Sequence, residues 1–190
     1  MAVTYIKHNA GIVIGDYHLA SSVKREVLRL LPLTETIDTE NLSNVKSTVH
    51  TDYNWEPTNR TFNNLKAYIV QEIETAFQPG ACIDDSRGKI TCDNFWAMVY
   101  KKGDWANEHC HKPYDYSFAY FVKAKWYHAP LVFASSGKRI RPKEGRFVAF
   151  PGYLRHYVPK QKFADDRITL SGNMVVPRPS LNKFNPRVSL

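Results

Sequence analysis

The feature that most constrains the fold is a change in sequence pattern near residue 94. After this point, short segments rich in β-branched and aromatic residues follow one another, separated by Gly, Pro or Asp turns: 94–100, 116–122, 131–134, 138–141, 146–150, 155–158 and 167–176. This spacing is typical of a β-sandwich or barrel. The first half of the chain carries helical patterns instead, so the order of elements predicts an α+β protein.

Two amphipathic helices are expected before these strands. Asp16 is a candidate N-cap for the first, which should end at Leu31 because Pro32 follows. The second should span about 61–77 and end before Pro79-Gly80. At helical spacing, the inward side chains would be Leu19, Val23, Val27, Leu30 and Leu31 in the first helix, and Phe62, Leu65, Ile69, Ile73 and Ala76 in the second. Both helices are expected to cover a sheet.

The remaining N-terminal segments carry weaker signals. Residues 2–6 and 11–14 are expected to form short strands, and 33–59 a polar loop with at most one short strand. The 190 residues suit one domain overall. Within it we expect a helical support region at 1–92, a barrel at 93–176 and a basic, proline-containing tail at 177–190.

Composition limits the class of protein. The mean hydropathy is −0.43 and no apolar run is long enough to span a membrane, so no membrane partner is expected. The three cysteines, Cys82, Cys92 and Cys110, form no CxxC motif and no even set, which favours a reducing compartment. We therefore expect a cytoplasmic protein.

The charge is unevenly distributed along the chain. The net charge is +8, but residues 1–92 hold 9 basic and 11 acidic side chains, whereas residues 93–190 hold 17 and 7. The basic half could attract a nucleic acid, an acidic protein surface or a small dicarboxylate. A soluble, merely basic surface explains the same numbers, and nothing else in the sequence supports nucleic acid.

Three histidines are candidates for a metal site. His109 and His111 are two residues apart, and in a strand such residues point to the same side. His156 lies on a separate expected strand and could supply a third imidazole, a ligand that suits Fe, Zn, Cu and Ni. A His-x-His pair alone is a weak signal. Cys110 should point away from the pair, and His8, His18, His50 and His128 should be surface or structural residues.

The last expected strand has one polar face. Along it, four polar residues alternate with apolar or small ones: Arg167, Thr169, Ser171 and Asn173. If this face lines the interior, the buried guanidinium needs an anion. A guanidinium beside a hydroxyl suits a carboxylate, which accepts two hydrogen bonds from arginine.

These residues resemble a known family. Tyr100-x2-Gly103-x5-His109-x-His111, the distal His156 and Arg167 eleven residues later follow the order found in 2-oxoglutarate- and Fe(II)-dependent oxygenases. The resemblance is to the prolyl-hydroxylase-like branch, including small members from bacteria and tailed phages. It covers about 94–176 and includes 141–152, which is similar to the strand before the family's distal histidine. The resemblance implies a double-stranded β-helix, or jelly roll, backed by the N-terminal helices.

The resemblance also implies roles for single residues. His109 and His156 would bind Fe(II), with position 111 as the third ligand. Arg167 would bind the distal carboxylate of 2-oxoglutarate, helped by Thr169, with Ser171 on the same face. Tyr100 would donate a hydrogen bond to the same cosubstrate. The implied reaction is hydroxylation of an unknown protein or small molecule.

The chain departs from the family at the third ligand, where His111 replaces the usual acid. With three neutral imidazoles, the metal site carries one more positive charge than a site with two histidines and a carboxylate. Such a site could also bind Zn or Ni. His111 is then a true ligand, or Asp115 or Glu108 substitutes, or the metal site is lost. Two other functions stay open: a non-catalytic jelly roll, such as a phage virion subunit that docks or self-associates through the basic half and tail, and a three-His cupin-like metalloprotein.

Overall fold

Two antiparallel sheets form the body of the protein. The computed structural model describes residues 11–38, 44–77 and 89–177. The six-stranded sheet has the order β1-β9-β6-β11-β4-β3, and the five-stranded sheet has the order β2-β5-β10-β7-β8. The strands are β1 (Val13–Asp16), β2 (Val45–Lys46), β3 (Val49–His50), β4 (Thr91–Tyr100), β5 (Trp105–His109), β6 (Tyr116–Lys123), β7 (Leu131–Phe133), β8 (Arg139–Ile140), β9 (Arg146–Pro151), β10 (His156–Val158) and β11 (Arg167–Val175).

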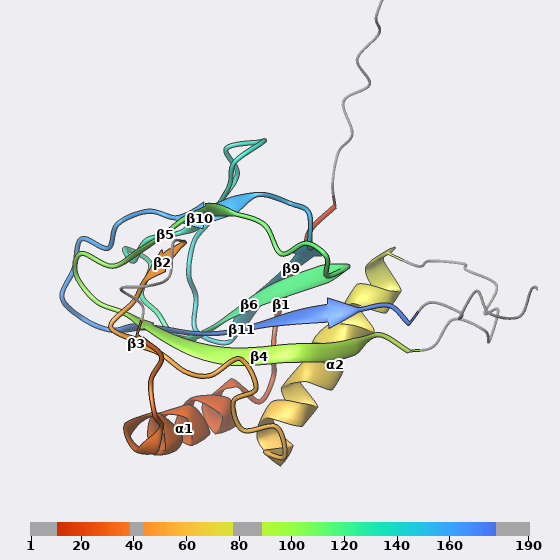
Figure 1. Ribbon diagram of the computed structural model, residues 1–190, viewed down its shortest axis with the longest axis horizontal. Helices are drawn as coiled ribbons and strands as arrows, with labels where there is room; N and C mark the ends of the chain where they lie inside the picture. The colour runs from red at the N-terminus through yellow and green to blue at the C-terminus, as the bar shows by residue number, and fades with distance from the viewer. Residues whose placement is uncertain (1–10, 39–43, 78–88, 178–190) are drawn as a thin grey trace, which may run out of the picture.

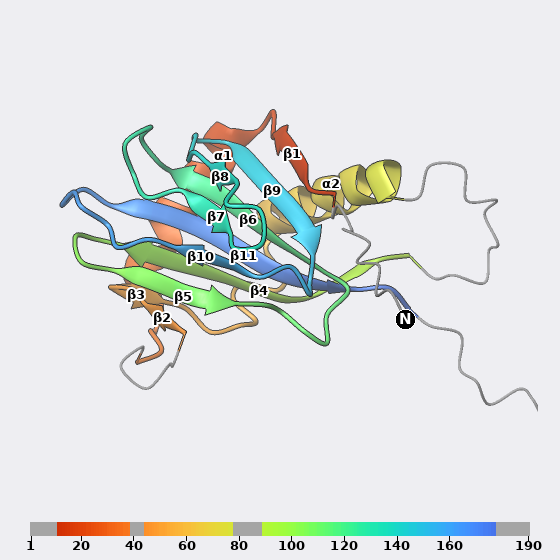
Figure 2. The ribbon, with the colours of Figure 1, turned by 90° about the horizontal axis from the view of Figure 1, so that it is seen from above.

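Two helices complete the fold as a third layer. They are α1 (Ala20–Leu30), which continues into a 3-10 turn at Leu31–Leu33, and α2 (Arg60–Phe77). Figure 1 shows both helices below the six-stranded sheet and the five-stranded sheet above it, and Figure 2 shows the strands from above. The α+β jelly roll backed by N-terminal helices is therefore confirmed.

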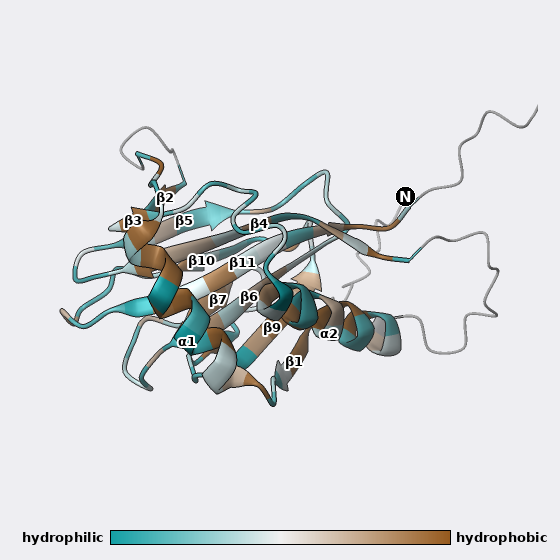
Figure 3. Ribbon diagram, turned by 90° about the horizontal axis from the view of Figure 1, so that it is seen from below, coloured by the Kyte–Doolittle hydropathy of each residue, from teal (hydrophilic) through white to brown (hydrophobic). Residues whose placement is uncertain are grey.

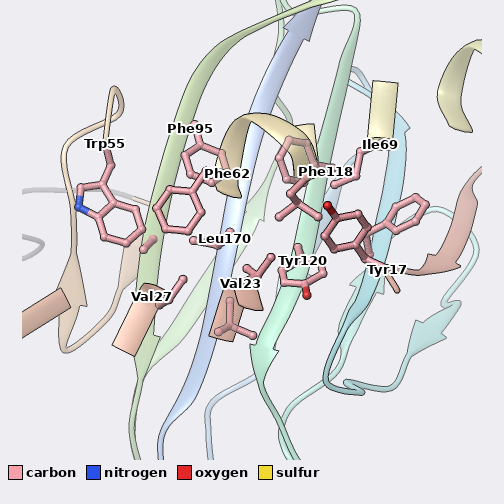
Figure 4. Packing of buried hydrophobic residues seen from close by; sticks show 14 of the residues in the cluster. Tyr17, Val23, Val27, Trp55, Phe62, Ile69, Phe95, Phe118, Tyr120 and Leu170 are labelled. Atoms are coloured by element: carbon pink, nitrogen blue, oxygen red, sulfur yellow. The ribbon is translucent and has the colours of Figure 1, made fainter. Parts of the chain in front are cut away.

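The main hydrophobic core lies between the helices and the six-stranded sheet. Val23 and Val27 of α1 and Phe62 and Ile69 of α2 are fully buried there (Figure 4). On the sheet side they meet Phe95, Phe118, Tyr120 and Leu170. Figure 3 shows both helices on the side of the sheet that they cover. Burying each large apolar side chain contributes about 1.5–3 kcal/mol, so this layer holds the sheet in place.

Two features at the helix starts explain where the helices begin. Asn59 caps α2, because its Oδ1 accepts hydrogen bonds from the backbone N–H groups of Thr61 (3.0 Å) and Phe62 (3.2 Å). Asp16 does not cap α1. It ends β1, and its carboxylate pairs with Lys143 and Arg146, so the helix begins only at Ala20.

Most of the expected inward side chains are buried, but three are not. Leu19 is 44% exposed because it precedes the first turn of α1, and Ala76 is exposed near the end of α2. Leu31 is only partly buried, since it lies in the 3-10 turn that contains Pro32.

The expected strands after residue 94 all occur, with bounds that differ by up to three residues. The segment 33–59 holds two strands rather than one, since β2 pairs with β5 and β3 pairs with β4. The division of the chain at residue 92 stays a prediction, and the N-terminal part adds strands to both sheets. The strand expected at 2–6 and most of the tail at 177–190 lie outside the described residues. Neither described helix is both long and apolar enough to cross a membrane.

Candidate metal and cosubstrate site

Two of the candidate histidines face each other across a strand pair. His109 ends β5 and His156 begins β10, and the antiparallel register places them directly opposite one another. Directly opposed residues project from the same side of a sheet. Their ring centroids are 4.5 Å apart. The fold thus brings together two residues that are 47 positions apart in the sequence.

His111 reaches the same point by a different route. Strand β5 ends at His109, so His111 lies outside it. The prediction that both histidines point to the same side of one strand is therefore wrong. Instead, the His111 backbone N–H donates to the Gly152 carbonyl (2.7 Å), and the His111 carbonyl accepts from the Tyr114 N–H (2.9 Å). A Cβ on Gly152 would lie 2.0 Å from the Tyr114 carbonyl oxygen, so this close approach requires glycine.

The three imidazoles form a cluster that can hold a metal ion. One ligand atom from each of His109, His111 and His156 lies within 4.8 Å of the other two. The Nε2 atoms of His111 and His156 are 3.3 Å apart. Two nitrogen ligands at about 2.1 Å from one ion, at tetrahedral to octahedral angles, are about 3.0–3.4 Å apart. The observed separation fits a shared ion.

Backbone carbonyls fix the tautomer of two of the rings, and this tautomer leaves Nε2 free to bind a metal. The Nδ1 of His109 donates to the Asn107 carbonyl (2.7 Å), and the Nδ1 of His156 donates to the Leu154 carbonyl (2.9 Å). A carbonyl only accepts, so the proton lies on Nδ1 and the Nε2 lone pair is left for a ligand bond.

Burial keeps these rings uncharged. Desolvation, with repulsion from neighbouring imidazoles, lowers the pKa of His111 and of His156 to about 3, and desolvation also lowers the pKa of His109. Neutral imidazole is the form that coordinates a metal. The cluster is therefore ready to bind a metal at neutral pH.

The cluster opens into a cavity of about 440 Å³, which we call the main cavity. Residues of both sheets line it, including His109, His111, His156, Arg167, Thr169 and Ser171. The polar face expected for the last strand is therefore inside the barrel. The apolar residues Ile168, Leu170 and Met174 of the same strand belong to the helix-side core.

Among the described residues, Arg167 is a buried cation without an anionic partner. It is 1% exposed, and its Nε and Nη1 have no hydrogen-bond partner in the part of the chain that the structure describes. The guanidinium lies over the rings of Tyr100 (5.0 Å) and Phe121 (5.2 Å). Burial lowers the pKa of Arg167 to about 10, which still leaves it charged at neutral pH. A buried charge is unfavourable unless it is paired, so this side chain favours the binding of an anionic ligand.

Hydroxyl groups accompany Arg167 along the cavity wall. The Thr169 Oγ1 is buried and has no partner within residues 11–38, 44–77 and 89–177, and Ser171 lies two residues further along the same face. The Tyr100 hydroxyl contacts only the Met98 sulfur (3.2 Å), a weak acceptor. Burial raises the pKa of Tyr100 to about 12, so it remains a donor.

The two acids proposed as substitute ligands lie elsewhere. Glu108 forms an ion pair with Arg155, and the Asp115 carboxylate accepts the Val176 N–H (2.8 Å). Neither belongs to the histidine cluster. Cys110 contributes to the cavity lining but is not one of the clustered ligands.

His50 is a buried histidine that the sequence did not place in the cavity. His50 is 1% exposed and lines the main cavity, where its ring stacks on Trp96 (6.3 Å between centroids, 10° between planes). Its only sequence signal is a place between the β-branched residues Val49 and Thr51. His128 is also buried, beside Asp165, but it does not line the cavity.

Comparison with known proteins supports this architecture. No family model matches the chain, and no curated protein matches it at the sequence level. Among solved structures, a Pseudomonas putida prolyl-4-hydroxylase is similar, with a TM-score of 0.65 and 14% identity over 87% of this chain and 92% of that one.

Two further solved structures contain 2-oxoglutarate. The viral collagen prolyl hydroxylase of Paramecium bursaria Chlorella virus-1 has a TM-score of 0.60 and 15% identity, over 86% of this chain and 94% of that one. HygX from Streptomyces hygroscopicus, with nickel and 2-oxoglutarate bound, has a TM-score of 0.61 and 9% identity, over 90% and 84%. The chain therefore has the jelly-roll fold of the 2-oxoglutarate- and Fe(II)-dependent oxygenases.

Proposed function

We propose that this protein is a 2-oxoglutarate- and Fe(II)-dependent oxygenase that binds its metal through His109, His111 and His156. One observation carries the proposal: a preformed cluster of three neutral imidazoles and a buried, unpaired guanidinium line the same cavity. A metal site alone fits many proteins, but a metal site and a carboxylate-binding arginine in one enclosed space fit a chelating dicarboxylate.

The cosubstrate fits the groups that lack partners. Arg167 would bind the distal carboxylate of 2-oxoglutarate through its fork of N–H donors. Thr169 would supply a hydroxyl to the same carboxylate, and Tyr100 and Ser171 would add donors along its length. These contacts would pair the buried charge of Arg167 and satisfy the Thr169 hydroxyl.

When bound, Fe(II) with 2-oxoglutarate and O2 supplies the oxidising chemistry that hydroxylates an unreactive C–H bond. The protein's part is to hold and orient. The Asn107 and Leu154 carbonyls fix the proton positions on His109 and His156. The rings of Tyr100 and Phe121 cover the Arg167 guanidinium and would keep water from the bound carboxylate.

An anaerobic titration with Fe(II) and then 2-oxoglutarate tests the proposal. The chelated complex absorbs visible light, and we expect this band to saturate at one cosubstrate per chain. Arg167→Met should weaken cosubstrate binding without changing the metal content. A matched control is Lys102→Met, since Lys102 is exposed and does not line the main cavity.

Each other result points to a different function. Stoichiometric metal without any response to 2-oxoglutarate would contradict the proposal and favour a three-His metalloprotein that uses another reaction. Absence of both metal and cosubstrate binding would indicate a non-catalytic jelly roll.

A further inference from the structure

The described residues that line the main cavity include no acidic side chain. Among the described residues that line it, the ionisable groups outside the histidine cluster and Tyr side chains are Arg167, Lys112, His50 and Cys110, and there is no aspartate or glutamate. Imidazole binds a metal as a neutral ligand, so the cluster itself adds no negative charge. The described part of the chain thus brings positive charge to this space and no carboxylate.

The acids close to the cluster in sequence are already engaged. Glu108 pairs with Arg155, and Asp115 accepts the Val176 N–H. Asp104 accepts hydrogen bonds from the Lys101 N–H and from Thr48. None of these carboxylates lines the main cavity, so none can balance the charge inside it.

Counting charges then leaves one positive charge over. A divalent metal ion and the Arg167 guanidinium together carry three positive charges, and 2-oxoglutarate brings two negative ones. In a site with a carboxylate ligand the remaining charge would be cancelled by the protein. Here His111 occupies that position, so an uncompensated charge stays in a buried space, which is unfavourable.

Lys112 adds a second positive side chain, on the His111 side of the main cavity. It directly follows His111 and is exposed, and it lines both the main cavity and a neighbouring surface hollow beside Tyr114 and Tyr153. Within the described residues, Lys112 has no ion-pair partner. Asp115 borders the same hollow, but its carboxylate is bound to the Val176 N–H.

We propose that the substrate of this site carries an anionic group, a carboxylate or another small oxyanion, that binds between the His111 side of the metal centre and Lys112. This inference rests on the proposed function. The negative charge that the chain lacks at position 111 would then come from the substrate. The His111 ring lies beside Trp96 (6.2 Å between centroids), so a flat or aliphatic body could pack there while its charged end faces Lys112.

The test uses acetate and acetamide, which have nearly the same size but differ in charge. Each is titrated anaerobically into the full-length protein that is saturated with Fe(II) and 2-oxoglutarate, at constant ionic strength. Calorimetry reports binding, and the visible band reports whether 2-oxoglutarate stays bound. The variants are His111→Asp, Lys112→Met and, as a matched control, Lys102→Met.

We expect acetate to bind the wild type at least tenfold more tightly than acetamide, with the band retained. His111→Asp should abolish this preference because it restores the missing charge, Lys112→Met should reduce it several-fold, and Lys102→Met should leave it intact. Equal binding of both probes to a protein that holds metal and 2-oxoglutarate would overturn the inference alone. Loss of the band as acetate binds would also overturn it, since acetate would then be competing at Arg167. Failure to bind metal or 2-oxoglutarate at all would overturn the proposed function and the inference together.

Discussion

The two faces of β11 have opposite roles, although they are built from alternate residues of one strand. Ile168 and Leu170 point to the helices and are fully enclosed by apolar side chains. Arg167 and Thr169 point into the main cavity, where they are equally buried but have polar atoms without hydrogen-bond partners among the described residues. The same degree of burial therefore stabilises the protein on one face and is costly on the other. A polar face that stays buried without partners is what a ligand site requires.

The largest expected effect is on the apolar face. Leu170→Ala should lower the free energy of unfolding by about 2–5 kcal/mol, because the fully buried side chain leaves a cavity in the core. Urea unfolding measures this change. The affinity of the folded variant for Fe(II) should match that of the wild type, and a large loss of metal affinity would show that the two faces are not independent.

Arg167→Met should weaken ligand binding and change stability only slightly. Replacing the cation should reduce 2-oxoglutarate affinity by roughly 100-fold, since a charge-assisted contact is lost. The free energy of unfolding should fall by no more than about 1 kcal/mol, because an unpaired buried charge is replaced by an apolar side chain of similar length. Calorimetric titration and urea unfolding test the two parts, and a severe loss of stability would indicate that Arg167 is structural.

Acid should destabilise the metal-free protein through the buried histidines that line the main cavity. The pKa of His111 and of His156 is about 3 in the folded state and about 6.5 in the unfolded chain. Between these values the unfolded chain binds more protons, so stability falls as the pH drops below about 6.5. We expect a loss on the order of 1 kcal/mol per pH unit for each histidine. Urea midpoints at pH 7.5, 6 and 5 test this, and the combined change of both residues to Gln should flatten the dependence.

Thr169→Val should give the smallest effect. The Thr169 hydroxyl has no partner, so the isosteric methyl group should leave the free energy of unfolding within about 1 kcal/mol of the wild type. The affinity for 2-oxoglutarate should fall by a few-fold. An unchanged affinity would remove Thr169 from the cosubstrate site and leave Arg167 as the main carboxylate contact.

The same contrast explains what the sequence could predict. Strand alternation in 167–176 and helical spacing in 61–77 depend on local periodicity, and both were confirmed apart from the exposed Ala76. The start of α1 was missed because Asp16 is held by Lys143 and Arg146, which are distant in the sequence. The histidine cluster was anticipated, but its geometry depends on the β5–β10 register and on the turn that Gly152 permits. His50 was missed because a single histidine in a short strand carries no periodic signal.

Metal content tests the central claim most directly. Wild-type protein, His156→Ala and Cys110→Ala are dialysed anaerobically against Fe(II), and bound iron is measured per chain. We predict one iron for the wild type and for Cys110→Ala, and a loss of bound iron for His156→Ala, because only the histidine belongs to the ligand cluster. Full iron content in a folded His156→Ala variant would contradict the assignment of this cluster as the metal centre.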